Sequence, residues 1–259
     1  MKTRIIPCIK LFLLYITSSH LLISCTSTKE AVYFNNLSDS LTINSAPPLQ
    51  QTINSNDILS ITVGSLNPEA TVIFNNPNPG LISSATGGYL VDQDGYVQFP
   101  VLGKIKAAGL TKKELTEFLR NTLVEKKLLV DPVVAVRFLN FRITVLGEVS
   151  RPMVVAVPNE KISILEAIGV AGDLTIYARR DNILLIREEN GQKILKRINL
   201  NSGDIFKSPY YYLKSNDIVY AEPNKSKIYS TSKSRQVLPV ILSALSLAAI
   251  IVDRATRKR

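Results

Sequence analysis

The chain has 259 residues and a formal net charge of +10, from 31 Lys and Arg against 21 Asp and Glu. Residues 25–222 hold 20 basic and 20 acidic side chains, so the excess lies in the two terminal segments. A neutral body gives no electrostatic footprint for nucleic acid, which excludes nucleic acid as a partner. The body is long enough for one large or two small domains.

The N-terminal segment, residues 1–24, has the features of a secretory signal peptide. Lys2, Arg4 and Lys10 are followed by short apolar stretches at residues 11–16 and 21–24. A membrane-spanning helix needs about 20 apolar residues, and these interrupted stretches are too short for one. The sequence therefore predicts an export signal that is removed from the mature protein.

Cys25 follows this segment directly, while the other cysteine, Cys8, lies within it. Leu22, Ser24 and Cys25 resemble the lipobox of bacterial lipoproteins, which implies that Cys25 carries lipid. The alternative is an ordinary signal peptide that ends near a cysteine, but a lone thiol would be a liability in an oxidising compartment. We expect lipidation at Cys25, followed by a polar tether over residues 25–50.

Residues 51–140 are predicted to form a first domain of α+β type. Alternating residues predict a strand at 58–63. The segment at 67–88 is rich in Asn, Pro, Gly and Ser, and residues 75–80 within it are predicted to be a loop. Asp94-Gly95 predicts a hairpin turn between two β-rich segments. Thr111-x-x-Glu114 is a capping box that starts a helix ending near Lys127, with apolar positions at Leu115, Phe118, Leu119 and Leu123. A strand over 130–139 completes the domain.

Residues 141–223 are predicted to form a second α+β domain. Two strands surround residues 150–152, and Ser163-x-x-Glu166 starts a short helix that ends before Gly172. Residues 189–191, Glu-Asn-Gly, predict the turn of a hairpin. The segment NDIV at 216–219 echoes NDIL at 56–59, but two short matches are too few to indicate a duplication.

The C-terminal segment consists of a basic linker at 224–236, an apolar run at 237–252 and a basic tail at 253–259. We expect the apolar run to form a membrane helix, although it is about 24 Å long and the hydrocarbon core is about 30 Å thick. A helical wheel places a weakly polar stripe on one side, formed by Arg235, Pro239, Ser243, Ser246 and Asp253. The alternative is a helix that is buried or lies on the membrane.

Residues for catalysis, metal binding or cofactor binding are not predicted. The single histidine, His20, lies in the signal peptide, which excludes histidine-based triads and zinc sites in the mature chain. Asp92-Gln93-Asp94-Gly95 is better explained as a turn than as half a calcium loop. Glu188-Glu189 is better explained as a solvated face than as a glycosidase pair. Tyr210-Tyr211-Tyr212 could stack on sugar rings, but a structural role is favoured.

Several motifs resemble one family of bacterial exporters. NDILSITV at 56–63, the segment 89–115 and VDPVVAVRF at 130–138 are similar to the polysaccharide export domain of outer-membrane capsule and exopolysaccharide exporters. VLGEVSRPMVV at 145–155, residues 162–175 and NDIVYAEP at 216–223 are similar to the β-grasp (SLBB-type) domain that follows it. The resemblance implies an α+β fold with these two domains in this order, of which the β-grasp domain is present once.

The same resemblance implies a function and partners. Members of this family are lipoproteins that assemble into rings conducting polysaccharide across the outer membrane, and they work with an inner-membrane polysaccharide copolymerase. We therefore expect a non-enzymatic, homo-oligomeric channel subunit, anchored by lipid in the outer membrane with its domains in the periplasm. The alternative is a periplasmic glycan-binding lipoprotein that forms no pore.

Overall fold

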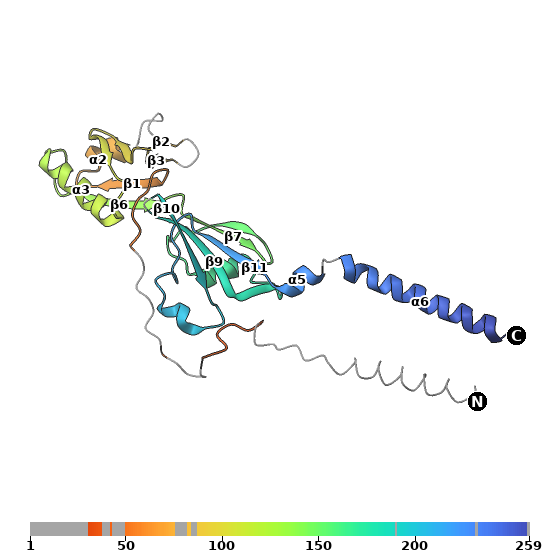
Figure 1. The fold of residues 1–259 in the computed structure, drawn as a ribbon. Helices are drawn as coiled ribbons and strands as arrows, with labels where there is room; N and C mark the ends of the chain where they lie inside the picture. The colour runs from red at the N-terminus through yellow and green to blue at the C-terminus, as the bar shows by residue number, and fades with distance from the viewer. Residues whose placement is uncertain are drawn as a thin grey trace.

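The computed structural model describes residues 31–37, 42, 50–75, 82–83, 87–189, 191–230 and 233–257. It contains two α+β domains in succession, and a long helix that projects from the second (Figure 1). The predicted signal peptide and Cys25 lie outside the described residues, so lipidation stays a prediction.

The first domain is built on a four-stranded sheet in the order β2-β3-β1-β6, with every neighbouring pair antiparallel. A separate hairpin and two helices complete it. The elements are β1 (Ile58–Gly64), α2 (Pro68–Asn75), β2 (Ile82–Ser83), β3 (Gly88–Leu90), β4 (Tyr96–Phe99), β5 (Gly103–Lys106), α3 (Lys112–Glu125) and β6 (Val133–Phe138).

Helix α3 confirms the predicted capping box. The Thr111 side chain accepts a hydrogen bond from the Glu114 N–H, and the Glu114 side chain accepts one from the Thr111 N–H at 2.7 Å. Leu115, Leu119 and Leu123 are buried at spacings of four residues. Phe118, predicted on the same apolar face, is 46% exposed. The buried face of α3 is therefore a single i, i+4 row, and Phe118 lies beside it.

The segment 67–88, rich in Asn, Pro, Gly and Ser, begins with a helix that was not predicted, α2. The predicted loop at 75–80 lies almost entirely outside the described residues. Asn67 Oδ1 accepts the Glu69 N–H at 3.1 Å, and Pro68 occupies the first helical position, where its missing N–H costs nothing. The Asn75 side chain then bonds both the N–H and the carbonyl of Val63, at 2.8 and 2.7 Å. Asn-Pro-Glu is a helix-start signal that the abundance of Asn, Pro and Gly concealed.

The hairpin predicted at Asp94-Gly95 is wrong in its pairing. The tight turn forms, since the Gly95 N–H donates to the Asp92 carbonyl at 3.0 Å. Its flanking strands belong to different sheets, because β3 pairs with β1 and β2 whereas β4 pairs with β5. The hairpin therefore turns at residues 100–102.

The second domain has a five-stranded sheet in the order β10-β9-β11-β7-β8. Strand β11 runs parallel to β7, and every other pair is antiparallel. This domain confirms the two predicted hairpins and the Ser163–Glu166 capping box. Its elements are β7 (Arg142–Gly147), β8 (Met153–Ala156), α4 (Ile164–Val170), β9 (Ala178–Glu189), β10 (Gln192–Ile198), η2 (Gly203–Lys207) and β11 (Ile218–Pro223).

Both domains use the same turn before an interior strand. Asn56 and Asn216 have left-handed backbones, with φ of 69° and 66°. The aspartates that follow, Asp57 and Asp217, are 2% and 1% exposed. In each turn the aspartate carboxylate accepts the N–H three residues earlier, at 2.8 Å. The echo noted in the sequence is therefore a shared local structure.

The segment 31–37, part of the predicted tether, contacts the second domain. The Phe34 N–H donates to the Leu200 carbonyl at 3.1 Å, and the Asn36 side chain accepts the Gly203 N–H at 3.0 Å. Tyr33 and Phe34 also pack against the hydrophobic core. This part of the polypeptide is consequently held against the second domain.

The chain ends in α5 (Lys225–Ser230) and α6 (Lys233–Arg257). Among the described residues, no helix is long and apolar enough to cross a membrane. The membrane helix predicted over 237–252 is therefore not supported. Although α6 has 25 residues, its apolar run measures about 24 Å at ~1.5 Å per residue, shorter than the hydrocarbon core. The side chains over 237–251 are all exposed.

Candidate functional site at the domain seam

Two side chains join the domains across a seam. The Glu160 carboxylate, from the second domain, accepts the Phe138 N–H at 2.7 Å and pairs with the Lys112 ammonium. Gln51, from the first domain, accepts the Ser215 N–H through Oε1 at 3.1 Å. Phe138 ends the edge strand β6, so Glu160 satisfies a backbone donor that the sheet leaves unpaired.

A cavity of about 370 Å³ lies at this seam. This volume falls within the roughly 300–1,000 Å³ range of small-molecule pockets, which occur preferentially between domains. Both domains contribute to its walls. The lining residues are Gln50, Gln51, Thr111, Lys112, Lys113, Phe138, Phe141 and Glu160.

The charges in the cavity leave a positive excess. The Glu160 side chain is 10% exposed, and each of its oxygens already has a partner, the Phe138 N–H or the Lys112 ammonium. Lys113 meets an acid only loosely, with 4.0 Å between its amine and the Glu117 carboxylate, and its side chain is 84% exposed. The carboxylate is thus used for holding the seam together, while a lysine remains available.

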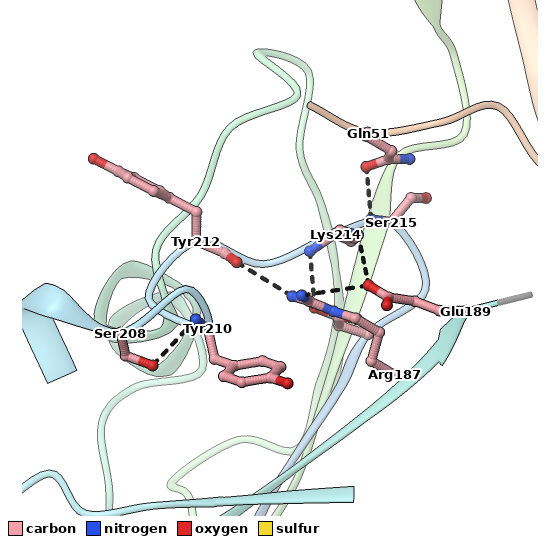
Figure 2. Close-up of polar contacts among 9 residues, drawn as sticks. Gln51, Arg187, Glu189, Ser208, Tyr210, Tyr212, Lys214 and Ser215 are labelled. Atoms are coloured by element: carbon pink, nitrogen blue, oxygen red, sulfur yellow. Dashed lines mark hydrogen bonds and ion pairs between the residues drawn. The ribbon is translucent and has the colours of Figure 1, made fainter. Parts of the chain in front are cut away.

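Beside the seam, an arginine is buried in the second domain (Figure 2). The Arg187 guanidinium donates to both Asp217 oxygens at 2.7–3.2 Å, and also to the Tyr212 carbonyl at 3.2 Å. Glu189 accepts from Lys214 at 2.6 Å. Burial raises the pKa of Asp217, and Arg187 acts in the opposite direction. Hydrogen bonding to Lys214 lowers the pKa of Glu189. This arrangement fixes the turn before β11.

The three consecutive tyrosines are held by cations and by other rings. The Tyr210 ring lies 5.4 Å from the Arg187 guanidinium and 5.7 Å from the Lys196 amine, and the Tyr212 ring lies 4.7 Å below the Lys161 amine. Tyr210 and Tyr211 pack against the core. These contacts favour the structural role predicted for the cluster over sugar stacking.

The predicted polar stripe falls on α6. The hydroxyls of Ser243 and Ser246 donate to the carbonyls of Pro239 and Leu242, at 2.7 and 2.9 Å. Both serines are therefore satisfied within the helix. Arg235 and Asp253 also belong to α6, but their side chains lie outside the description, so the stripe stays a prediction.

The predicted turn at Asp92 to Gly95 is held by the Asp92 carboxylate, which accepts the Tyr96 N–H at 2.7 Å. In the described part of the chain, no group of three His, Cys, Asp or Glu side chains could hold a metal ion. Sequence patterns did not indicate the seam cavity at all. Its walls come from segments around residues 50, 111, 138 and 160, and no local spacing connects them.

The two domains match two family models in chain order. The model described as polysaccharide biosynthesis/export protein matches residues 45–139, and the SLBB domain model matches residues 142–196. Together these matches cover more than half of the chain.

Curated relatives match the same region. The chain is 29% identical over 150 residues to the EPS I polysaccharide export outer membrane protein EpsA of Ralstonia solanacearum, covering 56% of this chain and 39% of the relative. The protein of the same name from Ralstonia nicotianae is 28% identical over 153 residues, with 58% and 39% covered. The match thus spans about two fifths of the relatives' length. This chain belongs to the polysaccharide biosynthesis/export family and carries an SLBB domain after its export domain.

Proposed function

We propose that this protein is a lipid-anchored subunit of an oligomeric outer-membrane conduit for capsular or extracellular polysaccharide. The observation that carries the proposal is the ordered pair of domains, an export domain followed by an SLBB domain. Two relatives that share this region are named polysaccharide export outer membrane proteins. The conduit is passive, and no bond in the polymer is made or broken.

Helix α6 provides a reason for oligomerisation. Its apolar side chains over 237–251 are exposed, as in Leu245 at 61% and Ile250 at 61%. A contiguous apolar surface on a helix requires a partner that removes it from water. We assign equivalent helices of neighbouring subunits as that partner. Cys25 anchors the subunit in outer-membrane lipid, and an inner-membrane polysaccharide copolymerase delivers the polymer.

A deletion strain tests the proposed role in export. We expect the polymer to be synthesised but not secreted, and secretion to return with the intact gene. A Cys25→Ser version should restore secretion poorly because it lacks the anchor, whereas Cys8→Ser is the matched control. Normal secretion in the deletion strain, with polymer still produced, would contradict the proposal.

A glycan-binding lipoprotein without a pore is the second candidate, and the seam cavity favours it. Native mass spectrometry of the detergent-extracted protein separates the two functions. A closed ring supports the conduit, and a monomer that persists in mild detergents supports the binder. Removal of residues 237–259 should disable a conduit and leave a binder active.

A further inference from the structure

We propose that the seam cavity binds a carboxylated sugar, as a unit of an acidic polysaccharide or as a free sugar acid. This inference rests on the proposed function for the source of the ligand. The chemical class of the ligand is argued from the side chains that line the cavity. About 370 Å³ corresponds to roughly a dozen waters at ~30 Å³ each, enough for one sugar ring and its substituents.

The charge of the cavity selects an anion. Its carboxylate, Glu160, is neutralised by Lys112 and also holds the Phe138 N–H, so it presents no unused oxygen for a cation. Lys113 adds a second positive charge to the wall, and the nearest acid, Glu117, is 4.0 Å away on an exposed i, i+4 pair. Exposed i, i+4 ion pairs contribute little to stability, so a ligand carboxylate can replace Glu117 as the partner of Lys113.

The neutral polar groups in the cavity select oxygen acceptors. Gln51 uses its amide oxygen to accept the Ser215 N–H, which leaves its NH₂ group as the part that can serve a ligand. The Thr111 hydroxyl is engaged at both ends, because it accepts the Glu114 N–H and donates to the Glu114 carboxylate. The Gln51 NH₂ group is therefore a donor that suits the hydroxyl and ring oxygens of a sugar, and Gln50 adds an amide with both donors and an acceptor to the cavity wall.

The remaining wall is aromatic. Phe138 and Phe141 line the cavity from the end of β6 and the start of the second domain, and each is about nineteen-twentieths buried, at 5% and 4% exposed. An apolar wall beside a few placed polar groups is the usual composition of a ligand pocket. The Lys112 amine lies over the Phe138 ring, 5.8 Å from its centroid. The C–H face of a pyranose therefore packs against the aromatic wall beside this amine, with its carboxylate turned toward Lys113.

Titration calorimetry on the full-length, detergent-extracted protein tests the assignment. The probes are trigalacturonate, galacturonic acid and the neutral maltotriose. We expect trigalacturonate to bind saturably and at least 10-fold more tightly than maltotriose. Lys113→Gln should weaken trigalacturonate binding at least 10-fold, whereas Lys126→Gln, at the opposite end of α3, should leave it unchanged. Both lysines are exposed, so neither change should unfold the protein.

Two results would overturn the assignment: equal affinity for the acidic and neutral oligosaccharides, or equal effects of the two lysine variants. Absence of saturable binding by every probe would overturn it as well. Similar affinity for galacturonic acid and trigalacturonate would support the site with the free sugar acid as its ligand. Loss of secretion in the deletion strain together with absent binding would remove the cavity assignment and leave the export function standing.

Discussion

The two domains place the same Asn-Asp-Ile turn before an interior strand, but they treat its buried aspartate differently. In the second domain, Arg187 donates to both oxygens of Asp217. In the first domain, Asp57 accepts the Asn54 N–H at 2.8 Å, and burial raises its pKa to about 6. The described structure records no ion pair for Asp57. A local backbone motif can thus be repeated while the electrostatic environment around it changes completely.

The difference indicates what each turn contributes. The Asp217 pair brings together β9, β11 and the tyrosine segment, since Arg187 also bonds the Tyr212 carbonyl. Asp57 serves only its own turn and the adjacent backbone. Because the buried ion pair is tied to tertiary structure, breaking it should cost far more than changing Asp57. Three predictions, in order of expected size, test this comparison.

Replacement of Arg187 by Met should have the largest effect. Removing one partner of a buried ion pair leaves an uncompensated charge, which costs about 3–5 kcal/mol of unfolding free energy. Urea denaturation at neutral pH measures this loss. Arg197→Met is the matched control, because Arg197 pairs with Glu222 at the surface and its side chain is 58% exposed, so we expect less than about 1 kcal/mol.

Hydrogen exchange should localise the Arg187→Met destabilisation to the second domain. Adding Asp217→Asn to Arg187→Met should recover part of the stability, because the orphaned charge is then removed. A loss below about 1 kcal/mol for the single variant would show that the pair is dispensable.

Asp57 should make the first domain less stable as pH rises. Its folded-state pKa of about 6 lies above the ordinary 3.8, so the folded protein binds this proton more tightly than the unfolded chain. The stabilisation is fully present below about pH 3.8 and is lost as pH rises through about 6. The shift corresponds to at most about 3 kcal/mol at ~1.36 kcal/mol per unit.

The Asp57→Asn variant should remove this pH dependence and raise stability at pH 7.5 by about 1–2 kcal/mol. Its amide oxygen can still accept the Asn54 N–H. Urea denaturation at pH 4.5 and 7.5, for wild type and variant, measures the change. Asp94→Asn, on an exposed turn, is the control. The prediction would be contradicted if the difference in unfolding free energy between wild type and Asp57→Asn were the same at pH 4.5 and pH 7.5.

The capping boxes should show the smallest effects. Ser163 is 3% exposed, and its hydroxyl accepts the Glu166 N–H at 3.2 Å, while Thr111 caps α3 in an exposed position. Ser163→Ala should cost about 1 kcal/mol and Thr111→Ala about 0.5 kcal/mol, since water cannot replace the hydroxyl at the buried cap. Ser163→Thr and Thr111→Ser are conservative controls. Equal losses of unfolding free energy for the two alanine variants would show that burial does not make the Ser163 cap more stabilising than the Thr111 cap.

Sequence patterns predicted the structure best where the hydrogen bonds of a segment are made by residues of the same segment. The capping boxes at Thr111 and Ser163 were predictable because the cap and its partner are three residues apart. The β9–β10 hairpin was predictable because its turn residues are adjacent. The start of helix α2 is equally local, through Asn67 and Pro68, but the abundance of Asn, Pro and Gly around it is also typical of a loop.

Local sequence patterns did not predict the pairing of a strand that had more than one possible partner. The Asp94-Gly95 turn is real, but β3 pairs with β1 and β2 rather than β4. Choosing among such partners depends on the packing of the whole domain, which no short pattern contains. For the same reason, sequence patterns did not indicate the seam cavity or the contacts of residues 31–37 with the second domain.

By itself, the sequence determined the two-domain α+β order, the starts of α3 and α4 and the position of an apolar C-terminal helix, because each depends on residues a few positions apart. Tertiary structure alone decided that Arg187 meets Asp217, thirty residues away, and that Glu160 closes the seam onto Lys112 and Phe138. Buried charges and cavities require several distant segments to converge. Their existence therefore follows from how the segments pack together.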